Sequence, residues 1–114
     1  MKESDLKELE ALPRSSTCRL ISFDNAEVVP GIVSNTFFLV VSGVKPWLTM
    51  KVELVPLIYI RQPEYWGIEV IGCQSGIGLP AQAPYHVSLD ISHLRGTVGV
   101  EVIGATLKKQ IKVS

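Results

Sequence analysis

The chain has few charged residues and no net charge. Charged residues make up 19% of its 114 residues, and 11 lysines and arginines balance 11 aspartates and glutamates. The charged share of typical domains is about 25%. Because binding to a phosphate backbone needs a positive surface, we expect no nucleic-acid partner. A small domain with few charges leaves apolar side chains on its surface. We expect a second copy of the chain to cover part of that surface in a homodimer.

Long hydrophobic runs are also absent. The longest strongly apolar stretches are TFFLVV and LVPLIYI, whereas a membrane-spanning helix needs about 18 or more apolar residues. The N-terminal MKESDLKELEALPRSS is charged, and no apolar core of a secretory signal follows it. The sequence therefore predicts no membrane partner and a cytoplasmic location.

Residues that bind metals are scarce. The chain has two cysteines, Cys18 and Cys73, and two histidines, His86 and His93. Without an export signal we expect two reduced thiols, with a disulfide as the alternative. His86, His93 and Cys73 are the candidate ligands. The two histidines differ by an odd number, so on a continuous strand they face opposite sides, and the set lacks a fourth ligand. We predict no metal and no cofactor.

Helical spacing occurs only near the N-terminus. Ser4 is a suitable N-cap, Leu6, Leu9 and Leu12 lie three residues apart, and Pro13 stops the helix. Two turns are marginal alone, so this helix either docks through its leucines or frays. We expect residues 1–16 to form a short helix or tail and residues 17–114 to form a single β domain.

Beyond Pro13 the apolar residues alternate with polar ones. Residues 49–54 and 85–92 show this period clearly, and seven or eight such segments are separated by turn signals. The pattern predicts an all-β fold, an antiparallel β-sandwich with immunoglobulin-like Greek-key topology favoured and a small barrel as the alternative. Pro56 predicts a bulge, an edge strand or a split of its run into two strands, and Lys109 indicates an edge strand. The predicted core comprises Val52, Leu54, Ile68, Val70, Val87, Leu89, Val100 and Val102.

Two heptapeptides share five of seven letters. They are WGIEVIG at 66–72 and VGVEVIG at 98–104, and the similarity ends at both borders, unlike a structural repeat. We interpret them as two similar strands that end in glycines able to turn or bulge, Gly72 and Gly104. Because like charges directly opposite each other are destabilising, Glu69 and Glu101 should not be cross-strand partners.

No residues with catalytic spacing are apparent. His86, Ser88 and Asp90 contain the residue types of a hydrolase triad, but alternate residues on a strand stand about 6.5–7 Å apart and point the same way. A nucleophile and its base must lie within about 3 Å. We therefore predict a solvated polar face and assign no catalytic residue.

Aromatic residues near turns provide the best indication of a contact surface. The candidate binding residues are Arg61, Glu64, Tyr65, Trp66, Trp47 and Tyr85. They favour a non-catalytic protein-interaction or assembly module over an enzyme. We expect it to form a homodimer, and an unknown protein is the second candidate partner.

An alternative function is the binding of a small apolar molecule between the sheets, by a β-barrel-like binder or enzyme. It predicts an internal pocket with a polar group, Tyr59 or Arg61, at its mouth. The residues expected to line it are Phe37, Leu39, Leu54 and Ile58.

Overall fold

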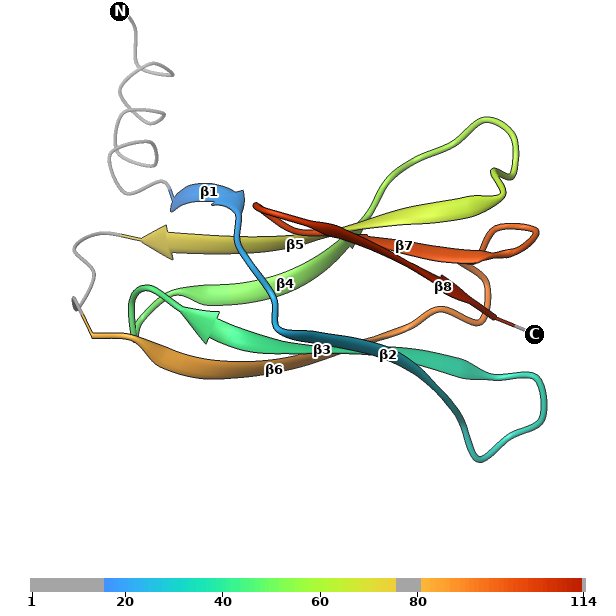
Figure 1. Cartoon of the computed structure of the whole chain (residues 1–114), viewed down its shortest axis with the longest axis horizontal. Helices are drawn as coiled ribbons and strands as arrows, with labels where there is room; N and C mark the ends of the chain where they lie inside the picture. The colour runs from blue at the N-terminus through green and yellow to red at the C-terminus, as the bar shows by residue number, and fades with distance from the viewer. Residues whose placement is uncertain (1–15, 76–80, 114) are drawn as a thin grey trace, which may run out of the picture.

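The computed structural model describes residues 16–75 and 81–113, and all regular structure within them is β (Figure 1). Eight strands are present, at the upper end of the expected number. They are β1 (Ser16–Leu20), β2 (Asn25–Pro30), β3 (Phe37–Lys45), β4 (Lys51–Pro56), β5 (Tyr65–Ser75), β6 (Ala83–Asp90), β7 (Gly99–Ile103) and β8 (Lys108–Lys112).

The strands form two stacked sheets, which confirms the predicted sandwich (Figure 1). The smaller sheet has the order β2-β3-β6. In the larger sheet, β4 pairs with one edge of β5. The other edge of β5 pairs with β7 over its first half and with β1 over its second half, and β8 extends the sheet beyond β7.

One strand pair departs from the expected antiparallel arrangement. β5 and β7 run parallel, which requires a crossover between them. The chain makes this crossover through the opposite sheet, because β6 lies between β5 and β7 in sequence and pairs with β3. A strand therefore takes the place of the helix that usually connects parallel strands. The immunoglobulin-like topology stays a prediction, and the expected N-terminal helix lies outside the described residues.

The two similar heptapeptides form this parallel pair. They are offset by two residues, so that Ile68 lies opposite Val102. An even offset keeps side chains on their faces, because side chains alternate with a period of two. Glu101 lies opposite Gly67, and Glu69 lies opposite Ile103. The two glutamates are therefore not direct partners, as predicted.

The core lies between the inner faces of the two sheets. Five of the eight predicted core residues are buried, namely Leu54, Ile68, Val70, Val100 and Val102. The other three, Val52, Val87 and Leu89, are partly exposed and pack against the core. The smaller sheet contributes Leu39 and Val41 from its central strand, both fully buried. Alternation thus predicted which side chains face inward, and position in the sheet decides how completely each is covered.

The two repeated glycines have different roles. Gly104 follows β7, and its N–H donates to the Leu107 carbonyl over 2.9 Å, so it opens a turn as predicted. Gly72 does not end its strand, because β5 continues to Ser75. A Cβ at Gly72 would press on the Met50 side chain and lie 2.9 Å from the Ile21 Cγ2 atom. The absence of a side chain there lets the core pack closely against the strand.

Edge positions follow the sequence signals. Pro56 ends β4, which pairs only with β5. Lys109 lies on the edge strand β8, and its Nζ atom donates to the Ala26 carbonyl of β2 over 2.8 Å. This hydrogen bond joins the two sheets along one side of the sandwich, while the lysine also keeps the edge polar.

The cysteines are joined by a disulfide, which makes the prediction of reduced thiols wrong. Cys18 of β1 lies directly opposite Cys73 of β5, with 4.1 Å between the Cα atoms. Disulfides persist mainly in oxidising compartments, so the cysteines no longer support a cytoplasmic location. Among residues 16–75 and 81–113, the structure has no helix long and apolar enough to cross a membrane.

Adjacent positions on β4 test the two faces of the larger sheet. Leu54 is buried in the core, whereas Val55 points outward and is 38% exposed. Leu54→Ala should lower the free energy of unfolding by about 2–5 kcal/mol because it leaves a cavity. The matched Val55→Ala should cost less than about 1 kcal/mol. Urea denaturation measures both, and equal losses would contradict the assigned faces.

Reduction of the disulfide should destabilise the domain. The bond closes a loop with a sequence separation of 55, and loop-closure entropy predicts a loss of about 4 kcal/mol on reduction. Urea denaturation with and without a phosphine reductant measures this loss, and a Cys18→Ser, Cys73→Ser variant should not respond to the reductant. Two free thiols in a non-reducing titration of the purified protein would contradict the bond.

Candidate functional site

Three loops gather at one end of the sandwich (Figure 1). They are residues 31–36 between β2 and β3, residues 57–64 between β4 and β5, and residues 91–98 between β6 and β7. We call this the Trp66 end, since Trp66 lies at the start of β5 there. The opposite end, which carries the β3–β4 loop at 46–50, is called the Trp47 end.

Hydrogen bonds from side chain and backbone join two of these loops into one base. The Gln62 side-chain amide donates to the Arg95 carbonyl over 2.9 Å. The Thr97 N–H donates to the Pro63 carbonyl over 2.9 Å. Gly96 packs so closely that a Cβ there would overlap the Pro63 backbone. The loops at 57–64 and 91–98 therefore present their side chains from a single connected support.

A cleft of about 450 Å³ opens on this support. It is lined by Tyr59, Ile60, Arg61, Gln62, Trp66, Ser92, His93 and Arg95. Most of these side chains are polar or aromatic, and the two loops supply nearly all of them.

The aromatic wall of the cleft is held by hydrogen bonds. The rings of Tyr59 and Trp66 meet edge to face, with centroids 5.2 Å apart. The Trp66 Nε1–H donates to the Leu57 carbonyl over 2.9 Å, and the Tyr59 hydroxyl accepts from the Gly67 N–H over 3.1 Å. Both rings are thus fixed before any ligand arrives, which reduces the entropy lost on binding.

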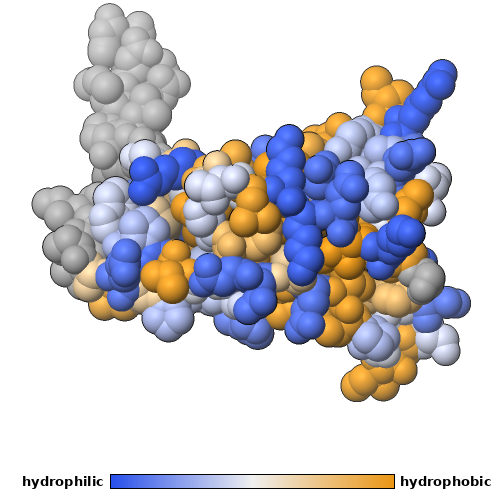
Figure 2. All heavy atoms as spheres, viewed as in Figure 1, coloured by the Kyte–Doolittle hydropathy of each residue, from blue (hydrophilic) through white to orange (hydrophobic). Residues whose placement is uncertain are grey.

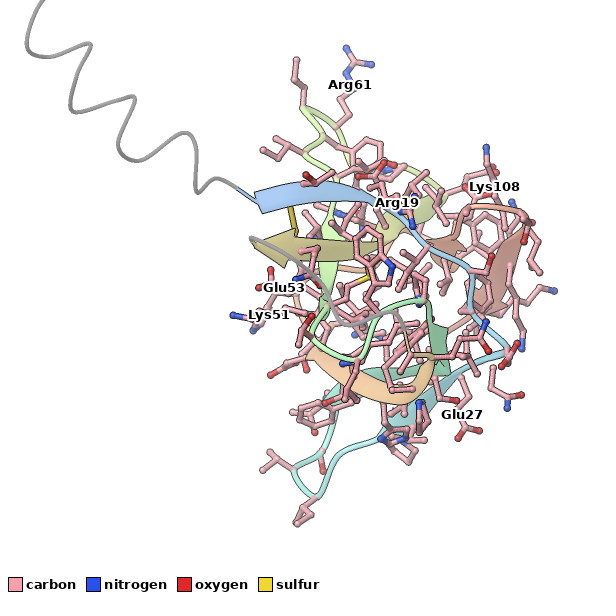
Figure 3. The ribbon with its side chains drawn as sticks, turned by 90° about the vertical axis from the view of Figure 1, so that its left-hand side faces the viewer. Arg19, Glu27, Lys51, Glu53, Arg61 and Lys108 are labelled. Carbon is pink, nitrogen blue, oxygen red and sulfur yellow. A yellow bond between two sulfur atoms is a disulfide. The ribbon has the colours of Figure 1, made fainter. Side chains whose placement is uncertain are left out.

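The two arginines of the cleft have no acidic partner among residues 16–75 and 81–113. The Arg95 guanidinium lies over the Phe37 ring, 4.8 Å from its centroid, in a cation–π contact. Arg61 is exposed and projects from the tip of its loop (Figure 3). Within the described part of the chain the ion pair present is Lys51–Glu53 on β4, so neither arginine is neutralised by a described carboxylate.

Asp90, the acid nearest in sequence to the 91–98 loop, is already engaged. Its Oδ1 atom accepts from the Ser92 N–H over 2.9 Å and from the Ser92 hydroxyl over 2.7 Å. These hydrogen bonds hold the pKa of the Asp90 carboxyl below its usual range. The Ser92 hydroxyl oxygen also accepts from the Phe37 N–H over 3.1 Å, which ties the loop to β3.

Apolar side chains project from two of the loops. Ile32, Ile58 and Ile60 are essentially fully exposed, and Val33 is 67% exposed. Figure 2 shows apolar atoms at both projecting corners of this end. Loop 31–36 is tight, because the Gly31 N–H donates to the Thr36 carbonyl over 2.8 Å, and it presents Ile32 and Val33 outward. Contiguous exposed apolar surface marks interaction sites, and each of these two loops presents two large apolar side chains to solvent.

The structure brings some of the predicted contact residues together and separates others. Arg61 and Trp66 line the cleft. Glu64 and Tyr65 lie at the same end, where the Glu64 carbonyl accepts from the Val98 N–H over 2.8 Å. They support the cleft without lining it.

Trp47 and Tyr85 lie toward the opposite end. Arg19 stacks over Trp47, 5.6 Å from its ring centroid. Tyr85 is buried and donates its hydroxyl to the Ser22 carbonyl over 2.6 Å. Burial and the nearby Asp24 carboxylate raise the pKa of Tyr85 to about 12. Its ring therefore packs inside the sandwich and does not reach the cleft.

Sequence reasoning missed Arg95 as a site residue. Arg95 belongs to the turn HLRG, whose letters resemble those of any polar connection. Its place in the cleft depends on Phe37, which is distant in sequence and comes next to it only through the pairing of β3 with β6. No local signal could have found this pair.

The other candidate chemistries do not assemble into a site. His86, Ser88 and Asp90 are exposed along the outer face of β6, as their parity predicted. Across residues 16–75 and 81–113, no group of three or more histidines, cysteines, aspartates and glutamates is placed to hold a metal ion. Of the residues expected to line an internal apolar pocket, Leu39 is fully buried whereas Ile58 is 96% exposed, so the two do not share one space.

Comparison of the chain with protein families, with curated proteins and with solved structures finds no match.

Alkaline titration tests the buried position of Tyr85. An unfolded tyrosine ionises near pH 10, whereas folded Tyr85 holds its proton to about pH 12. Between these values the unfolded state releases a proton that the folded state keeps, so stability is full below about pH 10 and falls as the pH rises toward 12. Thermal melts at increasing pH should show this loss, and Tyr85→Phe should show less of it. An equal loss in both proteins would contradict the assignment.

Proposed function

We propose that the protein is a non-catalytic interaction module that assembles with a second copy of itself through the Trp66 end. The observation that carries the proposal is the exposure of Ile32, Ile58 and Ile60 on two loops of that end. Water contact with several large apolar side chains is unfavourable, by about 1.5–3 kcal/mol for each side chain that could otherwise be buried. A partner that covers them gains this free energy.

The composition of the end supports the same conclusion. Tyr59, Arg61, Trp66 and Arg95 line the cleft together with the exposed Ile60. Tyrosine, tryptophan and arginine are the residues most enriched among those that dominate binding energies. The low charge content of the chain, 19%, also supports self-association, because charged residues are depleted at the centres of interfaces.

The disulfide extends the proposal to the place of action. Cys18–Cys73 joins β1 to the C-terminal part of β5. A disulfide persists where the surroundings are oxidising. The module is therefore proposed to work in a non-reducing compartment.

Light scattering coupled to gel filtration tests the self-association. The wild-type chain should elute as a dimer at tens of micromolar. An Ile58→Ser, Ile60→Ser variant should weaken the dimer by at least about tenfold, the equivalent of 1.4 kcal/mol. Both side chains lie outside the core, so thermal melts of the variant should show an intact fold.

A matched substitution at the other end provides the control. Leu48 is 49% exposed and lies in the β3–β4 loop, so Leu48→Ser should leave the dimer unchanged. A wild-type protein that is monomeric at tens of micromolar would contradict the proposal. So would a doubly substituted protein that dimerises like the wild type.

A further inference from the structure

The cleft at the Trp66 end sets a chemical requirement for whatever occupies it. Arg61 and Arg95 offer guanidinium groups without an acidic partner among the described residues. Ile60 lines the cleft together with them, and Ile58 on the same loop is also exposed. Guanidinium groups pair strongly with carboxylates and with phosphates, and the carboxylate is the anion that unmodified protein side chains supply. The occupant should therefore carry several carboxylates interleaved with large apolar side chains.

The chain contains one segment of this composition. Residues 3–12 read ESDLKELEAL, with four acids, one lysine and three leucines. Its leucines have helical spacing and need a surface to cover them, because a helix of two turns is marginal alone. This segment lies outside the described residues and is characterised by its sequence alone.

The length of β5 argues against docking within one molecule. Ser16, which follows the segment, pairs with Ser75 at the end of β5, whereas the cleft lies beside Trp66 near its start. Nine residues of strand separate these positions, roughly 30 Å at about 3.3 Å per residue. A helix over residues 4–12 is about 13 Å long, and three extended residues add roughly 10 Å. The segment cannot reach into the cleft of its own chain and still lie along it.

We infer that residues 3–12 of one copy dock in the Trp66-end cleft of a second copy. The carboxylates of the segment pair with Arg61 and Arg95, and its leucines cover Ile58 and Ile60. Two copies that exchange their segments reciprocally form a closed dimer, the commonest symmetry for a self-complementary contact. This inference rests on the proposed function and names the segment that fills the site.

A synthetic peptide of residues 1–14 tests the segment directly. Titrated into a ¹⁵N-labelled full-length Leu6→Ser, Leu9→Ser, Leu12→Ser variant, whose own segment has lost the leucines proposed to hold it in the cleft, it should shift the Trp66 indole N–H signal and the amide signals of residues 59–62 and 92–96. A control peptide in which Glu3, Asp5, Glu8 and Glu10 are replaced by their amides keeps the leucines and removes the four negative charges. It should bind at least tenfold more weakly.

Substitutions in the labelled chain identify the surface that binds the peptide. Arg61→Gln and Arg95→Gln should each weaken binding of the acidic peptide by tenfold or more. Arg61→Gln is the cleaner test, because Arg95 also rests on Phe37. Arg19→Gln is the matched control, since Arg19 stacks on an aromatic ring at the Trp47 end and its loss should leave binding unchanged.

Three outcomes would overturn the inference. They are equal binding of the acidic and amide peptides, signal changes centred on the Trp47 end, and equal changes at the cleft on adding inorganic phosphate alone, which would mark a general anion site. These results are separable from failure of the proposed function. A dimer that is lost in the Ile58→Ser, Ile60→Ser variant, together with no peptide binding, would retain the Trp66 end as an interface and reject this segment.

Discussion

The hydrogen bonding of β5 along both of its edges is the constraint on which the rest of the structure depends. One edge carries β4, and the other carries β7 and then β1. The inner face of β5 places Ile68 and Val70 against the opposite sheet with no exposure to water. The strands β1, β4 and β7 pair with β5 directly, and β8 pairs with β7. Displacement of β5 would therefore separate the strands of the larger sheet.

This central strand also sets the two ends of the molecule apart. Trp66 lies near its start, where the cleft opens, and Cys73 lies near its finish, where the disulfide holds β1. The cross-link therefore secures the region that leads to the N-terminal segment, at a distance from the proposed contact surface. The proposed exchange between two copies depends on this separation along β5, between Ser75 beside β1 and Trp66 beside the cleft.

The Trp66 end combines a rigid support with side chains that are exposed to solvent. Its loops are joined through the backbone, as at Thr97 and Pro63, and its aromatic rings are fixed by hydrogen bonds. Arg61 and the exposed isoleucines project from this support. The loops of the support are already ordered before association. Covering these side chains therefore costs little loop entropy.

The alternation of apolar and polar residues alone determined the all-β class, the inward faces of the strands and the edge character of Lys109. These features follow from a period of two, which is local and can be counted along the chain. Strand pairing decided what counting could not. It made β5 and β7 parallel, placed Cys18 opposite Cys73, and moved Arg95 over Phe37. Each of these contacts joins residues far apart in sequence, so only the tertiary structure could select it.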